Sequence, residues 1–191
     1  IINDPDQLQA FYEAHKDDIW CGYNSRNYDQ FILKAILLDF NPKEVNDWII
    51  VKDRPGWKFS NLFWKIPLNN YDVMPNPPIG LKTMEGFMGN DIRESDVDFN
   101  IQRKLTPEEI AITVKYCRHD VEQTVEVFLE RKSEFDAMMQ MCQVFQMPLA
   151  GGDLVGTAPV VELALHHLLG VNTHRMMQTA LSAFSHGQSP K

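Results

Sequence analysis

The sequence predicts an α/β domain, because short apolar strand candidates alternate with segments that carry clear helix signals. Hydrophobic residues make up 44% of the 191-residue chain and charged residues 23%, which is the composition of a globular protein with a sizeable core. Each strand candidate is a short run of apolar or aromatic residues. The three candidates are Ile19–Tyr23, Asp47–Lys52 and Asn70–Met74.

Two helices are predicted in the first forty residues or so. The run Asp4-Pro5-Asp6-Gln7 combines an N-cap residue, a proline at the first helical position and a glutamine at the capping-box position. This helix is expected to continue to about Asp17. The segment Tyr28–Phe40 has the apolar spacing of a second helix, which Asn41-Pro42 ends.

Three further helices are predicted later in the chain. Leu81–Gly89 is a short helix that ends at a glycine, and Thr106-Pro107-Glu108-Glu109 is the strongest start signal in the sequence. We expect the helix that starts there to run past Glu134. An amphipathic helix is predicted at Ala158–Gly170.

The segment Lys52–Lys65 interleaves basic residues with tryptophan and phenylalanine. Such a mixture can stack the bases and contact the phosphates of a single-stranded nucleic acid. The alternative is a hairpin whose aromatic side chains cover the core. We favour the hairpin, and keep the basic side chains as candidate strand contacts.

Charge and cysteine content restrict the class of protein. The net charge of −8 argues against broad, charge-driven binding of nucleic acid, although metal-binding carboxylates would themselves be acidic. No apolar run approaches the ~20 residues that span a bilayer. Cys21, Cys117 and Cys142 have no metal-like spacing and are expected to be small buried hydrophobes. An odd, sparse cysteine count favours a reducing, cytoplasmic setting.

Two short motifs place candidate catalytic residues. The first, Asn24-x-x-x-Tyr28-Asp29, sets an aspartate at a strand-to-helix junction, where the helix dipole stabilises the anion that a hard metal ion prefers. The second, Tyr116-x-x-x-Asp120, sets a phenol and a carboxylate one helical turn apart on one face. The plainer alternatives are a helix-capping aspartate in the first motif, and a packed tyrosine with a solvated aspartate in the second.

In this order, the two motifs resemble the second and third motifs of the DEDD-type 3′–5′ exonucleases. The tyrosine before the last aspartate is similar to the tyrosine subclass, and more closely to the proofreading domain of phage-type DNA polymerases. The segment Leu81–Gly89 is also similar to those polymerases. The resemblance covers residues 1–147, whereas residues 148–191 resemble a linker and helix leading toward a polymerase domain, or a diverged tail.

The resemblance implies a ribonuclease-H-like exonuclease fold and a site of four carboxylates that hold two Mg²⁺ or Mn²⁺ ions. It implies that Asp29 and Asp120 are metal ligands and catalytic residues, and that Tyr116 orients the attacking water. Asn24 and Tyr28 would shape the substrate-binding loop. The implied partners are the 3′ end of single-stranded DNA and a polymerase domain of the same parent chain, with no membrane.

The family's first motif, Asp-x-Glu on the first strand, has no counterpart between Ile1 and Asp29. We therefore expect it upstream, and expect this chain to be a truncated domain that lacks the first antiparallel strands but has a C-terminal helical extension. Two carboxylates are too few for tight binding of two metals, so we expect little or no activity from the chain alone. The alternative is a non-catalytic nucleic-acid-binding or structural remnant with the same fold.

Overall fold

The fold was analysed in a computed structural model that describes residues 1–98, 101 and 103–144. These residues belong to two compact units, Ile1–Lys132 and residues 133–144, and each unit is considered separately. The predictions for residues 148–191, including the helix at Ala158–Gly170, lie outside the described residues. Among the helices of the described ranges, none is long and apolar enough to cross a membrane.

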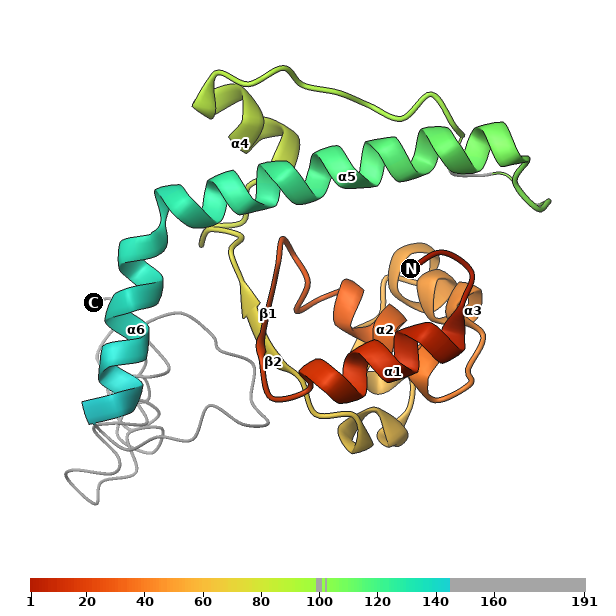
Figure 1. The fold of residues 1–191 in the computed structure, drawn as a ribbon, viewed down its shortest axis with the longest axis horizontal. Coiled ribbons are helices and arrows are strands. Elements are labelled where there is room, and N and C mark those ends of the chain that lie inside the picture. Colours follow the sequence, from red (N-terminus) through yellow and green to blue (C-terminus); the bar gives the residue numbers. More distant parts are fainter. Residues whose placement is uncertain (99–100, 102, 145–191) are drawn as a thin grey trace, which may run out of the picture. The chain divides into compact units, whose positions relative to one another are not determined.

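The first unit is a mixed α/β structure that is mostly helical (Figure 1). Its strands β1 (Ile19–Gly22) and β2 (Asn69–Asp72) form a parallel pair in which Ile19 lies opposite Asn69. The helices are α1 (Pro5–His15), α2 (Asp29–Leu37), α3 (Pro42–Asn46), α4 (Leu81–Met88) and α5 (Pro107–Glu130). Within the described ranges the sheet has these two strands, so an α/β fold is observed and a ribonuclease-H-like sheet remains a prediction.

The predicted strand at Asp47–Lys52 is wrong. Asn41 caps α3 by accepting a hydrogen bond from the backbone N–H of Lys43, and Pro42 occupies the first helical turn. The chain continues from α3 directly into a π-helical turn, Asp47–Val51. The apolar side chains of this run are not all buried: Ile49 packs against the core, whereas Ile50 and Val51 are exposed. Local helix initiation therefore outweighs the β propensity of this run.

The long helix α5 starts as predicted but ends earlier. Thr106 and Glu109 form a reciprocal capping box, with the Thr106 N–H donating to Glu109 Oε2 at 2.8 Å. Hydrogen bonds from Arg103 and the Thr106 backbone lower the pKa of Glu109 to about 2. The predicted continuation past Glu134 is wrong, because Arg131 leaves the helical conformation and donates a hydrogen bond to the Val73 carbonyl. A separate helix, α6, spans Lys132–Val144.

The main core packs around α2. Buried aromatic and aliphatic side chains form it, namely Phe31, Ala35, Val45 and Phe63. The Phe31 and Phe63 ring centroids lie 5.7 Å apart. Gly56 backs directly onto Phe31, and a Cβ at this glycine would lie 2.2 Å from the Phe31 ring. The short 3₁₀ turns Gly56–Lys58 and Asn61–Lys65 bring Gly56 and Phe63 to α2, so the segment expected to be a hairpin forms two helical turns.

Gly56→Ala tests this close approach. We expect the free energy of unfolding to fall by about 1–3 kcal/mol, because the added methyl group overlaps the buried Phe31 ring, which must shift out of its packing in the core. Urea denaturation measures the change.

The matched control is Gly86→Ala, at an exposed position in α4 where the nearest atom to the new Cβ is 3.6 Å away. Its expected effect has the opposite sign, a gain of about 0.5–1 kcal/mol from lower chain entropy in the unfolded state. Equal effects of the two variants would refute the packing argument.

Candidate functional site

Asp29 and Asp120 line the same cleft. The cleft has a volume of about 660 Å³ and is formed by β1, α2 and α5, together with Leu81 at the start of α4. Its walls also include apolar side chains, among them Trp20, Leu33 and Phe128. Two aspartates that lie 91 positions apart in the sequence therefore line one cleft.

The loop between β1 and α2 places Asp29. Asn24 adopts a left-handed conformation with φ of 55°, which asparagine tolerates better than most residues. Its side-chain oxygen accepts a hydrogen bond from Asn27 Nδ2 at 2.8 Å. Gly22 lets the loop turn closely, since a Cβ there would lie 2.7 Å from the Cβ of Ser25. The turn ends with Asp29 as the first residue of α2.

Asp72, at the end of β2, holds this loop in position. Its Oδ1 accepts hydrogen bonds from the backbone N–H groups of Asn24 at 2.8 Å and Met74 at 3.0 Å, and its Oδ2 accepts one from Arg26 at 3.0 Å. Charged acceptors make stronger hydrogen bonds than neutral ones, and three N–H donors satisfy most of this carboxylate. Sequence analysis missed Asp72, which lies in the middle of the predicted strand Asn70–Met74 and ends the observed strand β2.

The pKa of Asp29 is raised. Partial desolvation by the cleft walls is the main cause, and the negative charge of Asp72 adds to it, while a hydrogen bond from the Asp29 backbone N–H acts in the opposite direction. The side chain itself remains exposed to the cleft. Asp29 is thus an accessible carboxylate in surroundings that disfavour its negative charge, and a bound cation would relieve that cost.

Asp120 is paired with a cation from α4. Lys82 Nζ donates to Asp120 Oδ1 at 2.7 Å and lies 4.9 Å from the centroid of the Tyr116 ring. Partial burial lowers the pKa of Lys82, but its hydrogen bonds to Asp120 and Glu85 outweigh this and raise it overall. Burial and the charge of Asp120 raise the pKa of Tyr116, so its hydroxyl is protonated at neutral pH. Tyr116 and Asp120 therefore act on one ammonium group from the same face of α5.

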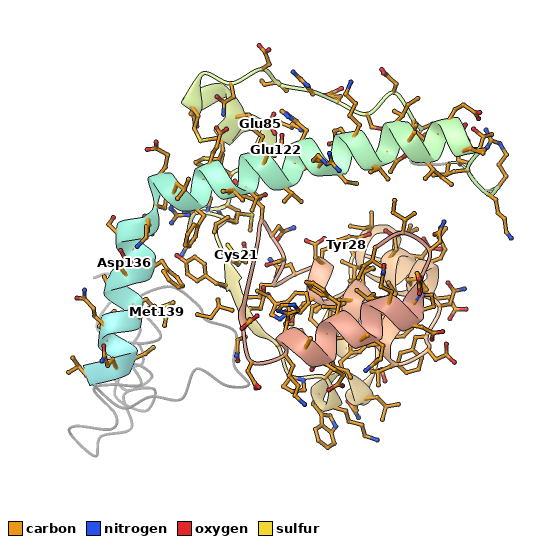
Figure 2. The ribbon with its side chains drawn as sticks, in the orientation of Figure 1. Cys21, Tyr28, Glu85, Glu122, Asp136 and Met139 are labelled. Atoms are coloured by element: carbon orange, nitrogen blue, oxygen red, sulfur yellow. The ribbon has the colours of Figure 1, made fainter. Side chains whose placement is uncertain are left out.

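The Lys82–Asp120 ion pair is extended by a buried glutamate, Glu85. Glu85 is fully buried, accepts a hydrogen bond from Lys82 at 3.0 Å, and has its second oxygen 3.8 Å from His119 Nε2. Figure 2 shows Glu85 on α4 beside α5. His119 is itself largely buried, with its side chain 13% exposed. Lys82 and Glu85 were missed from the sequence, although their spacing of three within a predicted helix was a signal for a pair.

The structure separates the remaining candidates from the cleft. The Tyr28 hydroxyl donates to Asn46 Oδ1 at 2.7 Å, and Tyr28 connects α2 to α3 rather than lining the cleft. Asn24 shapes the loop without lining the cleft, and Tyr116 lies beside Asp120 but does not line the cleft. Of the five candidates, Asp29 and Asp120 therefore share the cleft.

The expectation that all three cysteines are buried is wrong. Cys142 is buried, whereas Cys21 and Cys117 are exposed and line the cleft. Both are free thiols. The cleft surroundings raise the pKa of Cys21 to about 11, and desolvation together with the charge of Asp120 raises that of Cys117. Neither thiol is therefore an activated nucleophile.

The described residues do not by themselves fit a two-metal site. No group of three or more histidine, cysteine, aspartate or glutamate residues within residues 1–98, 101 and 103–144 is placed to hold a metal ion. Asp120, one of the two expected ligands, already carries the Lys82 ammonium. Hard divalent ions require six or more oxygen ligands, so further ligands would have to come from elsewhere.

Comparison with known proteins finds no matching family model, no matching curated protein and no matching solved structure.

A pair of aspartate substitutions tests the electrostatics of the cleft. The pKa of Asp29 is higher in the folded than in the unfolded protein. The contribution of Asp29 to the free energy of unfolding is therefore complete below its unfolded pKa of 3.8, and is lost as the pH rises through its folded pKa. Asp29→Asn should therefore gain stability relative to the unsubstituted protein as the pH rises from about 3 to about 7, as followed by urea denaturation midpoints.

Asp47→Asn is the matched control, because hydrogen bonds from Lys43 and Asn46 lower the pKa of Asp47. Asp47 contributes to the free energy of unfolding above its unfolded pKa of 3.8, and this contribution is lost as the pH falls through its folded pKa. This variant should lose relative stability as the pH rises. Parallel pH profiles for the two variants would contradict the assigned surroundings of Asp29.

Lys82→Met tests the ion-pair network. We expect a loss of about 1–3 kcal/mol in the free energy of unfolding, because the fully buried Glu85 is left without its cation. Adding Glu85→Gln should recover part of the loss, so the double-mutant cycle gives a coupling energy. Lys115→Met, at an exposed lysine of α5, serves as the control. If the losses in the free energy of unfolding caused by Lys82→Met and Glu85→Gln were strictly additive, the ion-pair network would be excluded.

Proposed function

We propose that this chain carries the second and third carboxylate motifs of a 3′–5′ exonuclease, the proofreading part of a phage-type DNA polymerase. The observation that supports the proposal is the shared cleft of Asp29 and Asp120. These are the two residues that the motif resemblance selects as metal ligands, and they come from different elements. If the two aspartates only capped a helix or contacted solvent, their roles would not require them to line the same cleft.

Three further features of the cleft agree with this function. Its walls desolvate Asp29, which favours the binding of a cation. Tyr116 keeps its proton beside Asp120, so its hydroxyl is a hydrogen-bond donor. Asn70 lines the cleft, is almost fully buried, and has a side-chain Nδ2 without a hydrogen-bond partner among the described residues. A buried donor without a partner is costly unless a bound molecule or water accepts from it.

In the proposed enzyme, Asp29 and Asp120 would supply two of the oxygen ligands for Mg²⁺ or Mn²⁺. Such ions would contribute Lewis-acid chemistry to the hydrolysis of the terminal phosphodiester of single-stranded DNA. The remaining ligands come from outside the described residues. Lys82 supplies positive charge to Asp120, and a metal at Asp120 would compete with it.

A non-catalytic nucleic-acid-binding or structural role is the second candidate. Two observations favour it, namely the ion pair between Lys82 and Asp120 and the absence of a metal-ligand group within the described ranges. The coding sequence upstream of Ile1 discriminates between the candidates. The exonuclease proposal requires an Asp-x-Glu strand there.

The activity test uses a polypeptide that includes this upstream strand, with 5′-fluorescein-labelled single-stranded DNA and Mg²⁺ or Mn²⁺. Asp29→Ala and Asp120→Ala should each slow the removal of 3′ nucleotides by about 100-fold or more, because each removes a metal ligand. Glu122→Ala, an exposed acid on α5 that does not line the cleft, should leave the rate unchanged. Undiminished digestion by both aspartate variants would refute the site.

A further inference from the structure

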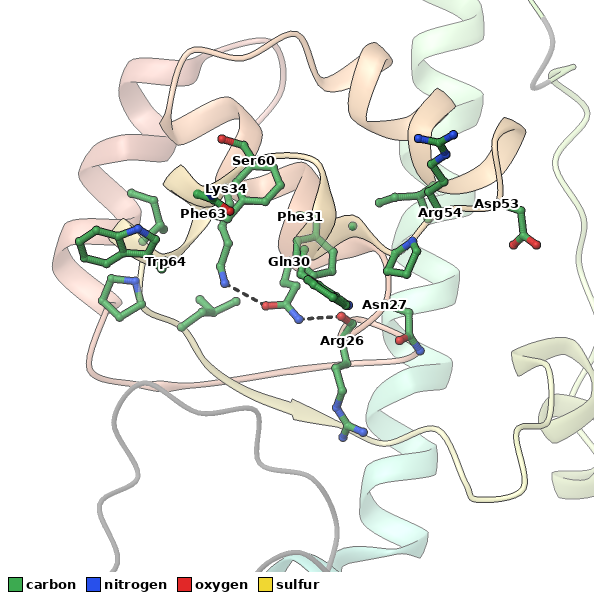
Figure 3. A pocket seen from close by; sticks show the side chains of 18 residues that line it. Arg26, Asn27, Gln30, Phe31, Lys34, Asp53, Arg54, Ser60, Phe63 and Trp64 are labelled. Carbon is green, nitrogen blue, oxygen red and sulfur yellow. Dashed lines mark hydrogen bonds between the residues drawn. The ribbon is translucent and has the colours of Figure 1, made fainter.

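A second cavity is lined by another part of α2. It has a volume of about 850 Å³ and lies between α2 and the segment Asp53–Leu68. Figure 3 shows Trp64 and Arg54 at opposite ends of this cavity, with Lys34 and Phe31 between them.

The tryptophans of this cavity are placed for contact with a ligand. Trp57 is 63% exposed and Trp64 is 75% exposed, whereas the neighbouring Phe63 is 4% exposed and belongs to the core. The aromatic residues of the segment therefore divide into a buried set and an exposed set. Sequence analysis favoured the interpretation in which they all cover the core, and this is wrong for the two tryptophans. Large exposed aromatic surfaces beside a cavity are typical of binding sites.

The cations of this region are arranged around the aromatic rings. Arg54 Cζ lies 4.7 Å from the centroid of the Trp48 ring, and Lys58 Nζ lies 5.0 Å from that of Trp57. Residues 52–65 contain four basic residues and one acidic residue, although the whole chain has a net charge of −8. None of these four basic residues forms a salt bridge within the described part of the chain.

We propose that this cavity binds single-stranded nucleic acid, with bases stacked on Trp57 and Trp64 and a phosphate held by Arg54. These three side chains line the cavity, whereas the other cations of residues 52–65 lie outside its lining. Exposed aromatic faces beside a guanidinium group match a ligand that alternates flat bases with negative phosphates. A protein partner would use the tryptophans but would not require the concentrated positive charge.

The cavity adjoins the candidate site. Gln30 and Leu68 line both this cavity and the cleft of Asp29 and Asp120, and Gln30 directly follows Asp29 in α2. A single strand whose 3′ end enters the cleft can thus continue past Gln30 into the cavity. This placement deepens the proposed function by naming where the strand is held, but binding in the cavity does not depend on catalysis.

Binding of fluorescein-labelled oligo(dT) and oligo(U) to the full chain, measured by fluorescence anisotropy in EDTA, tests the inference. Combined Trp57→Ala and Trp64→Ala substitutions should weaken binding by at least about tenfold, because stacking on both rings is lost. Trp64→Phe keeps an aromatic face and should retain most of the affinity. Arg54→Gln should reduce the slope of log affinity against log salt by about 0.7, the value for one phosphate contact of a single strand.

The matched control is Phe87→Ala, which removes an equally exposed ring, 74% exposed, from α4 outside the cavity. Its affinity should equal that of the unsubstituted chain. Three results would overturn the inference: no binding of either oligonucleotide, an equal loss of affinity with Phe87→Ala, or equal affinity for duplex DNA. The first of these would favour a protein partner. Tryptophan-dependent binding together with failed digestion would refute the exonuclease proposal and leave this inference standing.

Discussion

The carboxylate of Asp72 connects the end of the strand pair to the loop that begins α2, and the candidate site depends on this connection. The Asp72 carboxylate accepts hydrogen bonds from the backbone N–H groups of Asn24 and Arg26, and so fixes the turn that ends at Asp29. Its charge also contributes to the raised pKa of Asp29. One side chain thus sets both the position and the electrostatic surroundings of a cleft residue, although it does not line the cleft itself.

The other side of the cleft depends on a cation. Lys82 brings α4 to α5 by contacting Asp120, the Tyr116 ring and the buried Glu85. A fully buried carboxylate is tolerable only with a partner of opposite charge, so Lys82 is required for packing as well as for the charge of the cleft. Any metal at Asp120 would therefore alter the contact between the two helices.

Helix α2 separates two chemically different spaces. Asp29, at its first position, faces an acidic cleft with largely apolar walls, while Phe31 and Lys34 face a cavity that carries exposed tryptophans and basic residues. Gln30 lies between them, buried and hydrogen-bonded to the Arg26 carbonyl at 2.6 Å. Successive residues of a helix point about 100° apart, so one short helix can serve both spaces.

The sequence by itself determined the elements whose signals are local. The capping box depends on neighbours within a few residues, and apolar spacing marks the helices, so the helix starts and the positions of Asp29 and Asp120 in their elements were predictable. The strand expected at Asp47–Lys52 failed because helix initiation at α3 outweighs β propensity. Only the tertiary structure decided that Asp29 and Asp120 share a cleft, and that Asp72 and Lys82 support them. Those contacts join residues tens of positions apart, and such pairing depends on how the elements pack, which no local pattern encodes.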